Sequence, residues 1–365
     1  MLTLPEYPWD AMVPYREQAR RHPDGVVDLS IGTPVDPTPP VVREALAAAA
    51  DAPGYPTTHG RRELREAVAG WFGRRRGVAD LDPEAVMPTI GSKELVAWLP
   101  TLLGLGAGDV VLRPQVAYPT YDIGAQIAGA EVVAAEDPTT LDEETLARVK
   151  LIWVNSPSNP TGEVKTAEQL RAIVELARRL GAVVASDECY AELPWTVDEV
   201  PSILDPRVCG GDHRGLLAVY SASKQSNLAG YRAAFVAGCG ELIAGLINTR
   251  KHAGMIMPAP VQEALRVALT DDDHVAAQRE IYRRRREKLL GAVESRGLQV
   301  TGSQAGLYLW CADGSSDTWE IVSSLADEGI VVGPGVFYGD HGAGHVRVAL
   351  TAADERVDAA VDRLG

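Results

Sequence analysis

Two polar residues follow an apolar run in the stretch GAVVASDECYAEL. Asp187 and Tyr190 lie three residues apart there, directly after the residues that predict a buried strand. A carboxylate in this place can simply cap the strand, and the stretch alone favours that interpretation. The alternative is that the two side chains hold opposite sides of one aromatic ligand. Other polar segments of the chain are needed to decide between them.

A lysine with two neighbouring serines forms a second reactive group. Lys224 lies in SASKQSNLAGYR, with Ser221 and Ser223 before it and Arg232 eight residues after it. Most lysines that follow a strand are solvated surface charges. A lysine that is buried beside other cations loses its proton more readily, and its neutral amine is then a nucleophile and a base. Arginine's forked guanidinium suits a phosphate group better than the point charge of a lysine does.

Three further loops after predicted strands carry polar or aromatic residues. Gly91 and Ser92 in IGSKE precede a predicted helix, whose free backbone N–H groups and dipole favour an anion. Asn159 lies in NSPSNPTG, which by itself indicates only a turn. Tyr118 in RPQVAYPTY can be a core aromatic residue or a stacking partner for a ring.

Composition limits the class of protein. The chain has 365 residues, 46% of them hydrophobic and 23% charged, with a formal net charge of −15. This charge argues against a nucleic-acid surface and against docking on anionic lipid. No apolar run is long enough to span a bilayer, and the first residues lack the pattern of a secretory signal. Four scattered cysteines predict reduced thiols and no metal site, so we expect a cytoplasmic protein.

Apolar runs alternate with helical patterns through the middle of the chain. Runs such as DVVLRP, LIWVNSP and LLAVYSAS lack polar alternation, as strands buried on both faces do. The pattern predicts an α/β fold, with βαβ units that form a mostly parallel sheet. One helix, TAEQLRAIVELARRLG, carries a capping box at Thr166 and Gln169 and ends at Gly181.

The pattern changes beyond about residue 275. A long helix with a charged face is followed by short strands and further helices, which predicts a smaller α+β domain. The charge run RRRRE is expected to be a solvated face. The proline-rich N-terminal segment is expected to pack on this smaller domain. We therefore predict a large domain over 41–264 and a small domain formed by 1–40 and 265–365.

Taken in chain order, the loops IGSKE, RPQVAYPTY, NSPSNPTG, SDECY and SASKQSNLAGYR resemble those of the fold type I, class I/II pyridoxal-phosphate aminotransferases. The resemblance extends from DLSIGTPVDPTPP to HVRVALT, nearly the whole chain. It implies a large-domain sheet of seven strands, mostly parallel and sandwiched by helices. It also implies pyridoxal 5'-phosphate as cofactor and Lys224 as the lysine that forms the Schiff base with it and moves the substrate proton. The resemblance assigns the other cofactor contacts to Gly91, Ser92, the backbone N–H of Lys93, Tyr118, Asn159, Asp187, Tyr190, Ser221, Ser223 and Arg232.

The same resemblance implies particular roles. Asp187 pairs with the pyridine nitrogen, whereas Tyr190 and Asn159 donate to the phenolic oxygen. Arg347 in HVRVALT grips the substrate α-carboxylate, and the backbone of Gly32 approaches the same group. The list is completed by Tyr55, which reaches the phosphate from the neighbouring subunit. A homodimer with shared active sites is implied.

Several longer stretches, among them LSIGTPVDPTPPVVREAL and CGGDHRGLLAVYSASKQSNLAGYRAAFVAG, look like actinobacterial N-succinyl-L,L-diaminopimelate aminotransferases. This resemblance implies lysine and diaminopimelate biosynthesis, with glutamate as amino donor and N-succinyl-2-amino-6-oxopimelate as acceptor. So long an anionic substrate needs further cations, for which the candidates are Lys93, Arg20, Arg21 and Arg113.

Three alternatives stay open at this point. The first is an aminotransferase of another amino-acid specificity. The second is a C–S β-lyase or a decarboxylase on the same fold, because such enzymes keep the same lysine. The third is a non-catalytic effector domain of a transcription regulator, which the acidic composition disfavours. The N-terminal stretch MLTLPEYPWDAMVPY is also a candidate lid over bound substrate.

Overall fold

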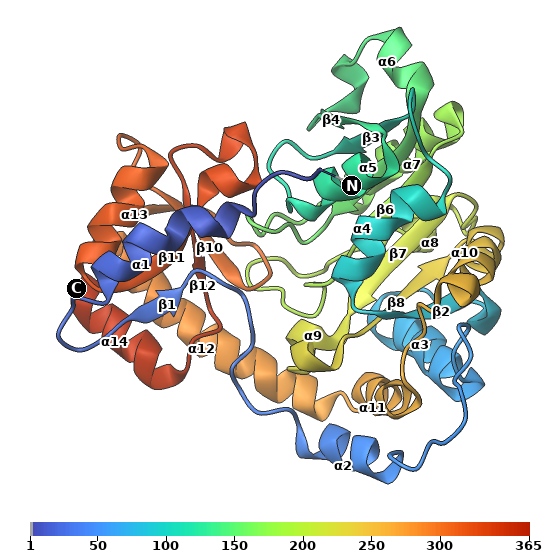
Figure 1. Ribbon diagram of the computed structural model, residues 1–365, viewed down its shortest axis with the longest axis horizontal. Helices are drawn as coiled ribbons and strands as arrows, with labels where there is room; N and C mark the ends of the chain where they lie inside the picture. The colour runs from blue at the N-terminus through green and yellow to red at the C-terminus, as the bar shows by residue number, and fades with distance from the viewer. Residues whose placement is uncertain (1–2) are drawn as a thin grey trace.

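A computed structural model describes residues 3–365. Met1 and Leu2, which begin both the expected small-domain segment and the candidate lid, lie outside the described residues. Two sheets, one large and one small, each carry their own helices, and the chain passes between the two halves near its N-terminus and again along a long helix, α12 (Asp273–Ser295) (Figure 1).

The large sheet has seven strands in the order β2-β8-β7-β6-β5-β3-β4. All neighbouring strands are parallel except those next to β8, which runs antiparallel to β2 and β7. The predicted fold class is therefore confirmed. The strands are β2 (Val86–Ile90), β3 (Val110–Arg113), β4 (Glu131–Ala134), β5 (Val149–Asn155), β6 (Val183–Asp187), β7 (Leu216–Ser221) and β8 (Ala233–Gly238).

Helices cover both faces of this sheet. Alternate residues of β5 separate the two cores: Ile152 packs with α3, α7 and α11, whereas Trp153 packs with α4, α5 and α10. Burial on both faces explains why the strands lack polar alternation. The helices of this half are α2 (Pro40–Ala48), α3 (Arg62–Arg75), α4 (Ser92–Leu102), α5 (Thr120–Ala128), α6 (Glu143–Arg148), α7 (Ala167–Leu180), α8 (Pro206–Cys209), α9 (Ala222–Gln225), α10 (Gly240–Ala253) and α11 (Ala259–Thr270).

The capping box predicted for α7 is confirmed. The Thr166 side chain accepts a hydrogen bond from the backbone N–H of Gln169 at 3.2 Å, and the Gln169 side chain accepts one from the backbone N–H of Thr166 at 2.8 Å. Gly181 ends the helix in the left-handed conformation with φ 66°.

The small sheet has five strands in the order β1-β11-β12-β10-β9. Its first strand pairs in parallel with β11, so the N-terminal segment packs on this sheet, as expected. The strands are β1 (Val27–Leu29), β9 (Gln299–Gly302), β10 (Tyr308–Ala312), β11 (Ile330–Pro334) and β12 (Val346–Ala349), and the helices are α1 (Val13–Ala19), α12, α13 (Thr318–Asp327) and α14 (Asp354–Leu364). The domain limits drawn after residues 40 and 264 stay predictions.

The charge run lies on α12, but it is not wholly solvated. Arg283 is exposed and pairs with Glu280 within the helix. Arg285 is buried instead, and its guanidinium contacts Asp36 and Asp354, each at 2.6 Å. The prediction of a solvated face is therefore wrong for Arg285, whose partners lie far away in the sequence.

No helix among residues 3–365 combines the length and the apolar character that crossing a membrane requires. The same residues contain no group of three or more histidine, cysteine or acidic side chains arranged to hold a metal ion.

Candidate active site

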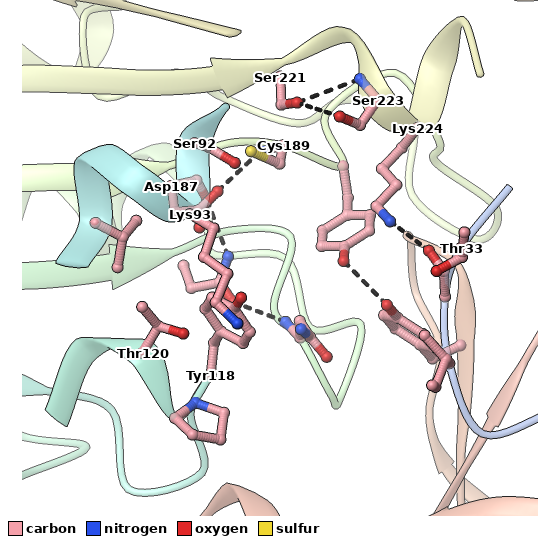
Figure 2. A pocket seen from close by; sticks show the side chains of 18 of the residues that line it. Thr33, Ser92, Lys93, Tyr118, Thr120, Asp187, Cys189, Ser221, Ser223 and Lys224 are labelled. Carbon is pink, nitrogen blue, oxygen red and sulfur yellow. Dashed lines mark hydrogen bonds between the residues drawn. The ribbon is translucent and has the colours of Figure 1, made fainter. Parts of the chain in front are cut away.

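A cavity of about 350 Å³ lies between the two halves. Its floor comes from residues at or just after the carboxyl ends of β5, β6 and β7 and from the start of α4, where parallel α/β sheets commonly bind ligands. Its opposite wall comes from the N-terminal segment, β10 and β12. Figure 2 shows Lys224 pointing across this space toward the segment that carries Thr33, with Asp187 and Ser92 to one side.

Lys224 lies on α9, the short helix that follows β7. Its ammonium group donates a hydrogen bond to the backbone carbonyl of Gly32. Burial lowers the pKa of this amine, and the nearby charges of Arg347 and Arg232 lower it further, although Tyr308 and Cys189 oppose the shift. The depressed pKa brings the neutral, nucleophilic amine within easier reach.

Two buried serines lie directly before this lysine. The Ser221 hydroxyl donates to the Ser223 hydroxyl at 2.8 Å, and the backbone N–H of Ser223 donates back to the Ser221 oxygen at 3.2 Å. Figure 2 shows the pair at one end of the cavity. Two hydroxyls and an N–H group thus gather where the strand ends.

Arg232 and Gly91 meet beside these serines. Arg232 has a left-handed backbone with φ 56°, and its guanidinium donates to the Ala229 carbonyl at 2.8 Å. Gly91 precedes α4 with φ 93°, and a β-carbon there would overlap the Arg232 guanidinium. No side chain caps the start of α4, so its first backbone N–H groups are free to bind an anion. The contact between Gly91 and Arg232 places them beside the guanidinium. Together they form a site suited to a phosphate.

Asp187 ends β6 and is buried, 8% exposed. Its carboxylate accepts hydrogen bonds from the Tyr121 hydroxyl at 3.0 Å and from the backbone N–H of Cys189 at 3.2 Å. No cation lies within ion-pair distance of it in residues 3–365. Burial therefore raises its pKa, although both hydrogen bonds oppose the shift. A cationic ligand group would relieve this desolvated charge.

Arg347 lies in the interior of the small sheet, and its side chain is 4% exposed. Its guanidinium donates to the Asn159 side-chain oxygen at 2.8 Å and to the Ser30 carbonyl at 2.6 Å. The rings of Tyr308 and Tyr338 lie 3.9 and 5.0 Å from its central carbon. Among the described residues no carboxylate pairs with it, so its charge is left for an anion that enters the cavity.

The structure brings most of the expected residues to one cavity. The lining includes Gly32, Ser92, Lys93, Tyr118, Asn159, Asp187, Tyr190, Ser221, Ser223, Lys224, Arg232 and Arg347, with Gly91 directly behind Arg232. Tyr118 packs edge-on against Tyr121, with ring centroids 5.9 Å apart, and burial raises the pKa of its phenol to about 12.

Other candidates are not brought there. Tyr55 is fully exposed and does not line the cavity of its own chain. Arg20 and Arg21 are exposed at the end of α1 and do not line it either. Arg113 pairs with Asp122 at 2.6 Å. Lys93 alone of the four candidate cations lines the cavity, where its ammonium group lies 5.9 Å from the ring of Tyr7.

Among the residues that sequence reasoning missed, two line the cavity, Cys189 and Tyr308, and one, Tyr121, lies behind Asp187. Tyr121 holds Asp187, Cys189 lines the floor, and Tyr308 lies between Arg347 and Tyr190. Tyr121 and Cys189 stand close in sequence to predicted site residues, which could have suggested them. Tyr308 lies in the apolar run LYLWCA and carries no such signal.

The cavity is basic in an acidic chain. Its described lining holds four cationic side chains, Lys93, Lys224, Arg232 and Arg347, against one carboxylate, Asp187. Such a focused positive potential attracts anionic ligands. The lysine, the phosphate-sized group of donors and the unpaired carboxylate together fit a phosphorylated aromatic aldehyde with a basic ring nitrogen.

The comparisons with known proteins agree with this site. The family model for aminotransferase class I and II matches residues 24–364, and the chain belongs to that family. Its members use pyridoxal 5'-phosphate. The chain is therefore a transaminase.

Individual relatives carry different names. The chain is 55% identical to the probable aminotransferase Rv1178 of Mycobacterium tuberculosis, over 99% of this chain and 85% of that one. It is 53% identical to the 4-dedimethylamino-4-oxo-anhydrotetracycline transaminase OxyQ of Streptomyces rimosus, over the full length of both. A solved structure of a probable N-succinyldiaminopimelate aminotransferase from Thermus thermophilus superposes with a TM-score of 0.87, at 30% identity and 98% coverage of both chains.

Proposed function

We propose that this enzyme transfers the amino group of glutamate to N-succinyl-2-amino-6-oxopimelate, as a succinyldiaminopimelate transaminase. The observation that carries the proposal is the basic cavity, whose four cations suit a cofactor phosphate and a substrate with several carboxylates. The name of the Thermus relative supports the same substrate class. The whole chain has a net charge of −15, so the excess of positive charge is a property of the cavity and not of the protein surface in general.

We infer that the floor of the cavity holds the cofactor. Gly91, Ser92 and the backbone of Lys93, with Ser221, Ser223 and Arg232, form the phosphate site, and Asp187 faces the ring nitrogen. Tyr118 lies against the ring, while Asn159 and Tyr190 face its phenolic oxygen. When bound, the cofactor supplies an electron-withdrawing ring for the substrate. Lys224 holds the cofactor and moves the proton at the substrate Cα.

The opposite wall is assigned to the substrate. Arg347 binds the α-carboxylate with its forked guanidinium, and the Gly32 backbone lies next to the same group. Lys93 stands farther out and is assigned to a distal carboxylate of the long acceptor. The variant Lys93→Met should raise KM for the succinylated acceptor about tenfold and leave KM for glutamate unchanged. Lys251→Met, on α10 away from this cavity, is the matched control.

A second acceptor is favoured by a separate observation. Five aromatic residues line the cavity in addition to Tyr190 and Tyr308, namely Tyr7, Trp9, Tyr118, Phe337 and Tyr338. They offer flat apolar surface to a polycyclic ketone, and the relative OxyQ is named for such a substrate. Other amino-acid specificities and C–S β-elimination on the same lysine remain the further alternatives.

We also propose a homodimer in which Tyr55 reaches the phosphate site of the partner subunit. Its fully exposed side chain supports this assignment, because the ring lies far outside the core of its own chain. Tyr55→Phe should weaken cofactor binding in the dimer. A protein that sediments as a monomer and still binds the cofactor tightly would contradict the proposal.

The visible absorption spectrum tests the proposed function most directly. Glutamate, added alone to the purified holoenzyme, should replace the yellow form of the cofactor by the pyridoxamine form, and the succinylated keto acid should restore the yellow form. Restoration by a polycyclic ketone instead would favour the second acceptor. Release of pyruvate and ammonia from a thioether amino acid, with no response to glutamate, would favour the lyase.

A further inference from the structure

Tyr308 touches both the cofactor side and the substrate side of the cavity. It lies on β10 and is 3% exposed. Its hydroxyl lies 3.1 Å from the Tyr190 hydroxyl, and its ring lies 3.9 Å from the central carbon of the Arg347 guanidinium. The side chain thus spans the distance between two groups that the proposed function assigns to different ligands.

The backbone of Gly32 fixes the place of this hydroxyl. A β-carbon at Gly32 would overlap the Tyr308 oxygen, so the phenol lies directly against that backbone. The carbonyl of the same glycine accepts the hydrogen bond from Lys224. The Tyr308 hydroxyl therefore lies beside the lysine as well as beside Tyr190, and glycine is the only residue that leaves room for it.

Either phenol can donate in the hydrogen bond between Tyr190 and Tyr308. Burial alone would raise the pKa of Tyr308, but the charges of Arg347 and Lys224 outweigh it and lower that pKa. Burial raises the pKa of Tyr190 well above its usual value, and its contact with Tyr308 adds to the increase. With a ligand in the cavity, Tyr308 can donate and Tyr190 can accept, because each phenol carries one proton and its oxygen also accepts. The proton of Tyr190 is then free to point at a ligand.

The ring of Tyr308 acts on Arg347. A guanidinium over an aromatic face is attracted by the ring quadrupole, more strongly when water is excluded. The same guanidinium donates to Asn159 and Ser30, so the ring completes a cage that leaves few orientations to the arginine.

We propose that Tyr308 is a positioning residue for transamination, a role that rests on the proposed function. Its hydroxyl directs the Tyr190 hydroxyl toward the phenolic oxygen of the cofactor, and its ring holds Arg347 ready for the substrate α-carboxylate. One side chain thereby links the alignment of the cofactor to that of the substrate.

Two substitutions separate the two parts of this role. Tyr308→Phe removes the hydroxyl and keeps the ring, whereas Tyr308→Leu removes both. The readout for the hydroxyl is the pH titration of the visible absorbance of the bound cofactor, without amino donor or keto acid. Because a weaker Tyr190 bond stabilises the deprotonated cofactor less, Tyr308→Phe should raise the midpoint by about 0.5 pH unit, on the order of one ordinary hydrogen bond.

The readout for the ring is KM for glutamate. Tyr308→Phe should leave it unchanged, whereas Tyr308→Leu should raise it about tenfold, because the cation–π contact is lost. Tyr338→Phe is the matched control, since its ring also lies near Arg347 and no hydrogen bond of its hydroxyl is found in residues 3–365. It should leave the midpoint of the titration unchanged.

Two results would overturn the proposal. One is a Tyr308→Phe midpoint equal to that of the wild type while Tyr190→Phe shifts it. The other is a shift of equal size in Tyr338→Phe, which would indicate a general disturbance of the cavity. If Tyr308→Leu does not fold, the comparison of the two phenylalanine variants still decides the hydroxyl. The titration contains no substrate, so its failure is distinct from failure of the glutamate reaction.

Discussion

Two buried arginines, Arg250 and Arg347, lie in opposite halves of the molecule and differ in their partners. Arg250 on α10 is fully buried and donates to both carboxylate oxygens of Glu94, at 2.8 and 2.9 Å. Arg347 is almost as buried, but it donates only to neutral oxygens, those of Asn159 and Ser30. The first arginine is neutralised within the fold, and the second is not.

This difference separates a structural charge from a binding charge. A buried guanidinium without an anion costs free energy, and the protein keeps that cost low with aromatic rings and neutral acceptors rather than with a carboxylate. A carboxylate at this place would compete with the substrate. Asp187 is the acidic counterpart, a buried carboxylate held by neutral donors. Both groups lie in the cavity, and both lack a charged partner among the described residues.

The largest effect is expected at Lys224, which lines the same cavity as these two groups. Lys224→Ala should lower kcat at least about 10⁴-fold, because both the covalent attachment and the proton transfer are lost. The melting temperature of Lys224→Ala should not fall, because the substitution removes a buried amine that has no anionic partner. Turnover and a thermal melt check both points. Full activity in this variant would disprove the catalytic assignment.

The next largest effect is expected at Arg347, the arginine that binds the substrate. Arg347→Ala should lower kcat/KM for glutamate about 10³-fold, the usual consequence of losing one partner of a buried, hydrogen-bonded charge pair. The free energy of unfolding should change little, because no carboxylate loses its partner. Arg283→Ala, on the exposed face of α12, is the control and should change neither quantity. A large loss of stability in Arg347→Ala would show that its role is structural.

The third prediction concerns Arg250, the arginine that stabilises the fold. Arg250→Met leaves the Glu94 carboxylate half-buried without its partner, and should lower the free energy of unfolding by about 3 kcal/mol. The double variant Arg250→Met with Glu94→Leu should recover most of that loss, because no lone charge remains. Denaturant melts measure both. KM for glutamate should be the same in both Arg250 variants as in the wild type. A change in KM would contradict the assignment of Arg250 to a purely structural role.

The smallest effect concerns Asp187 and pH. Burial raises the pKa of this carboxyl above its unfolded value, so ionising it destabilises the cofactor-free fold as pH rises through the folded pKa. Cofactor-free Asp187→Asn should therefore melt higher than the wild type at pH 8, and the difference should vanish below the unfolded pKa of aspartate. The same variant should bind the cofactor more weakly. Equal melting temperatures at pH 8 would contradict the assignment.

The site residues that follow parallel strands could be predicted from the sequence. Asp187 and Lys224 each follow an apolar strand, and parallel strands in one sheet bring such positions to the same edge. The capping box of α7 was equally accessible, because all its partners lie within four residues. The partners in the capping box are close in sequence, and the parallel topology of the sheet brings Asp187 and Lys224 to the same edge.

Residues whose partners are distant in sequence could not be predicted. Arg285 looks like its exposed neighbours Arg283 and Arg284, and only Asp36, far away in sequence, shows why it is buried. Tyr308 looks like any strand tyrosine until Arg347 and Tyr190 are brought beside it. The sequence also did not show that the side chain of the candidate Arg113 pairs with Asp122.

The pairing of β1 with β11 has a consequence for how the protein is made. Val27 lies opposite Ile330, so the first strand of the chain must wait for residues synthesised near the end. Long-range contacts of this kind form late and slow folding. On the ribosome, the large sheet and Lys224 can be complete while the wall that carries Arg347 is not yet made. The nascent chain thus acquires its reactive lysine before it acquires the means to select a substrate.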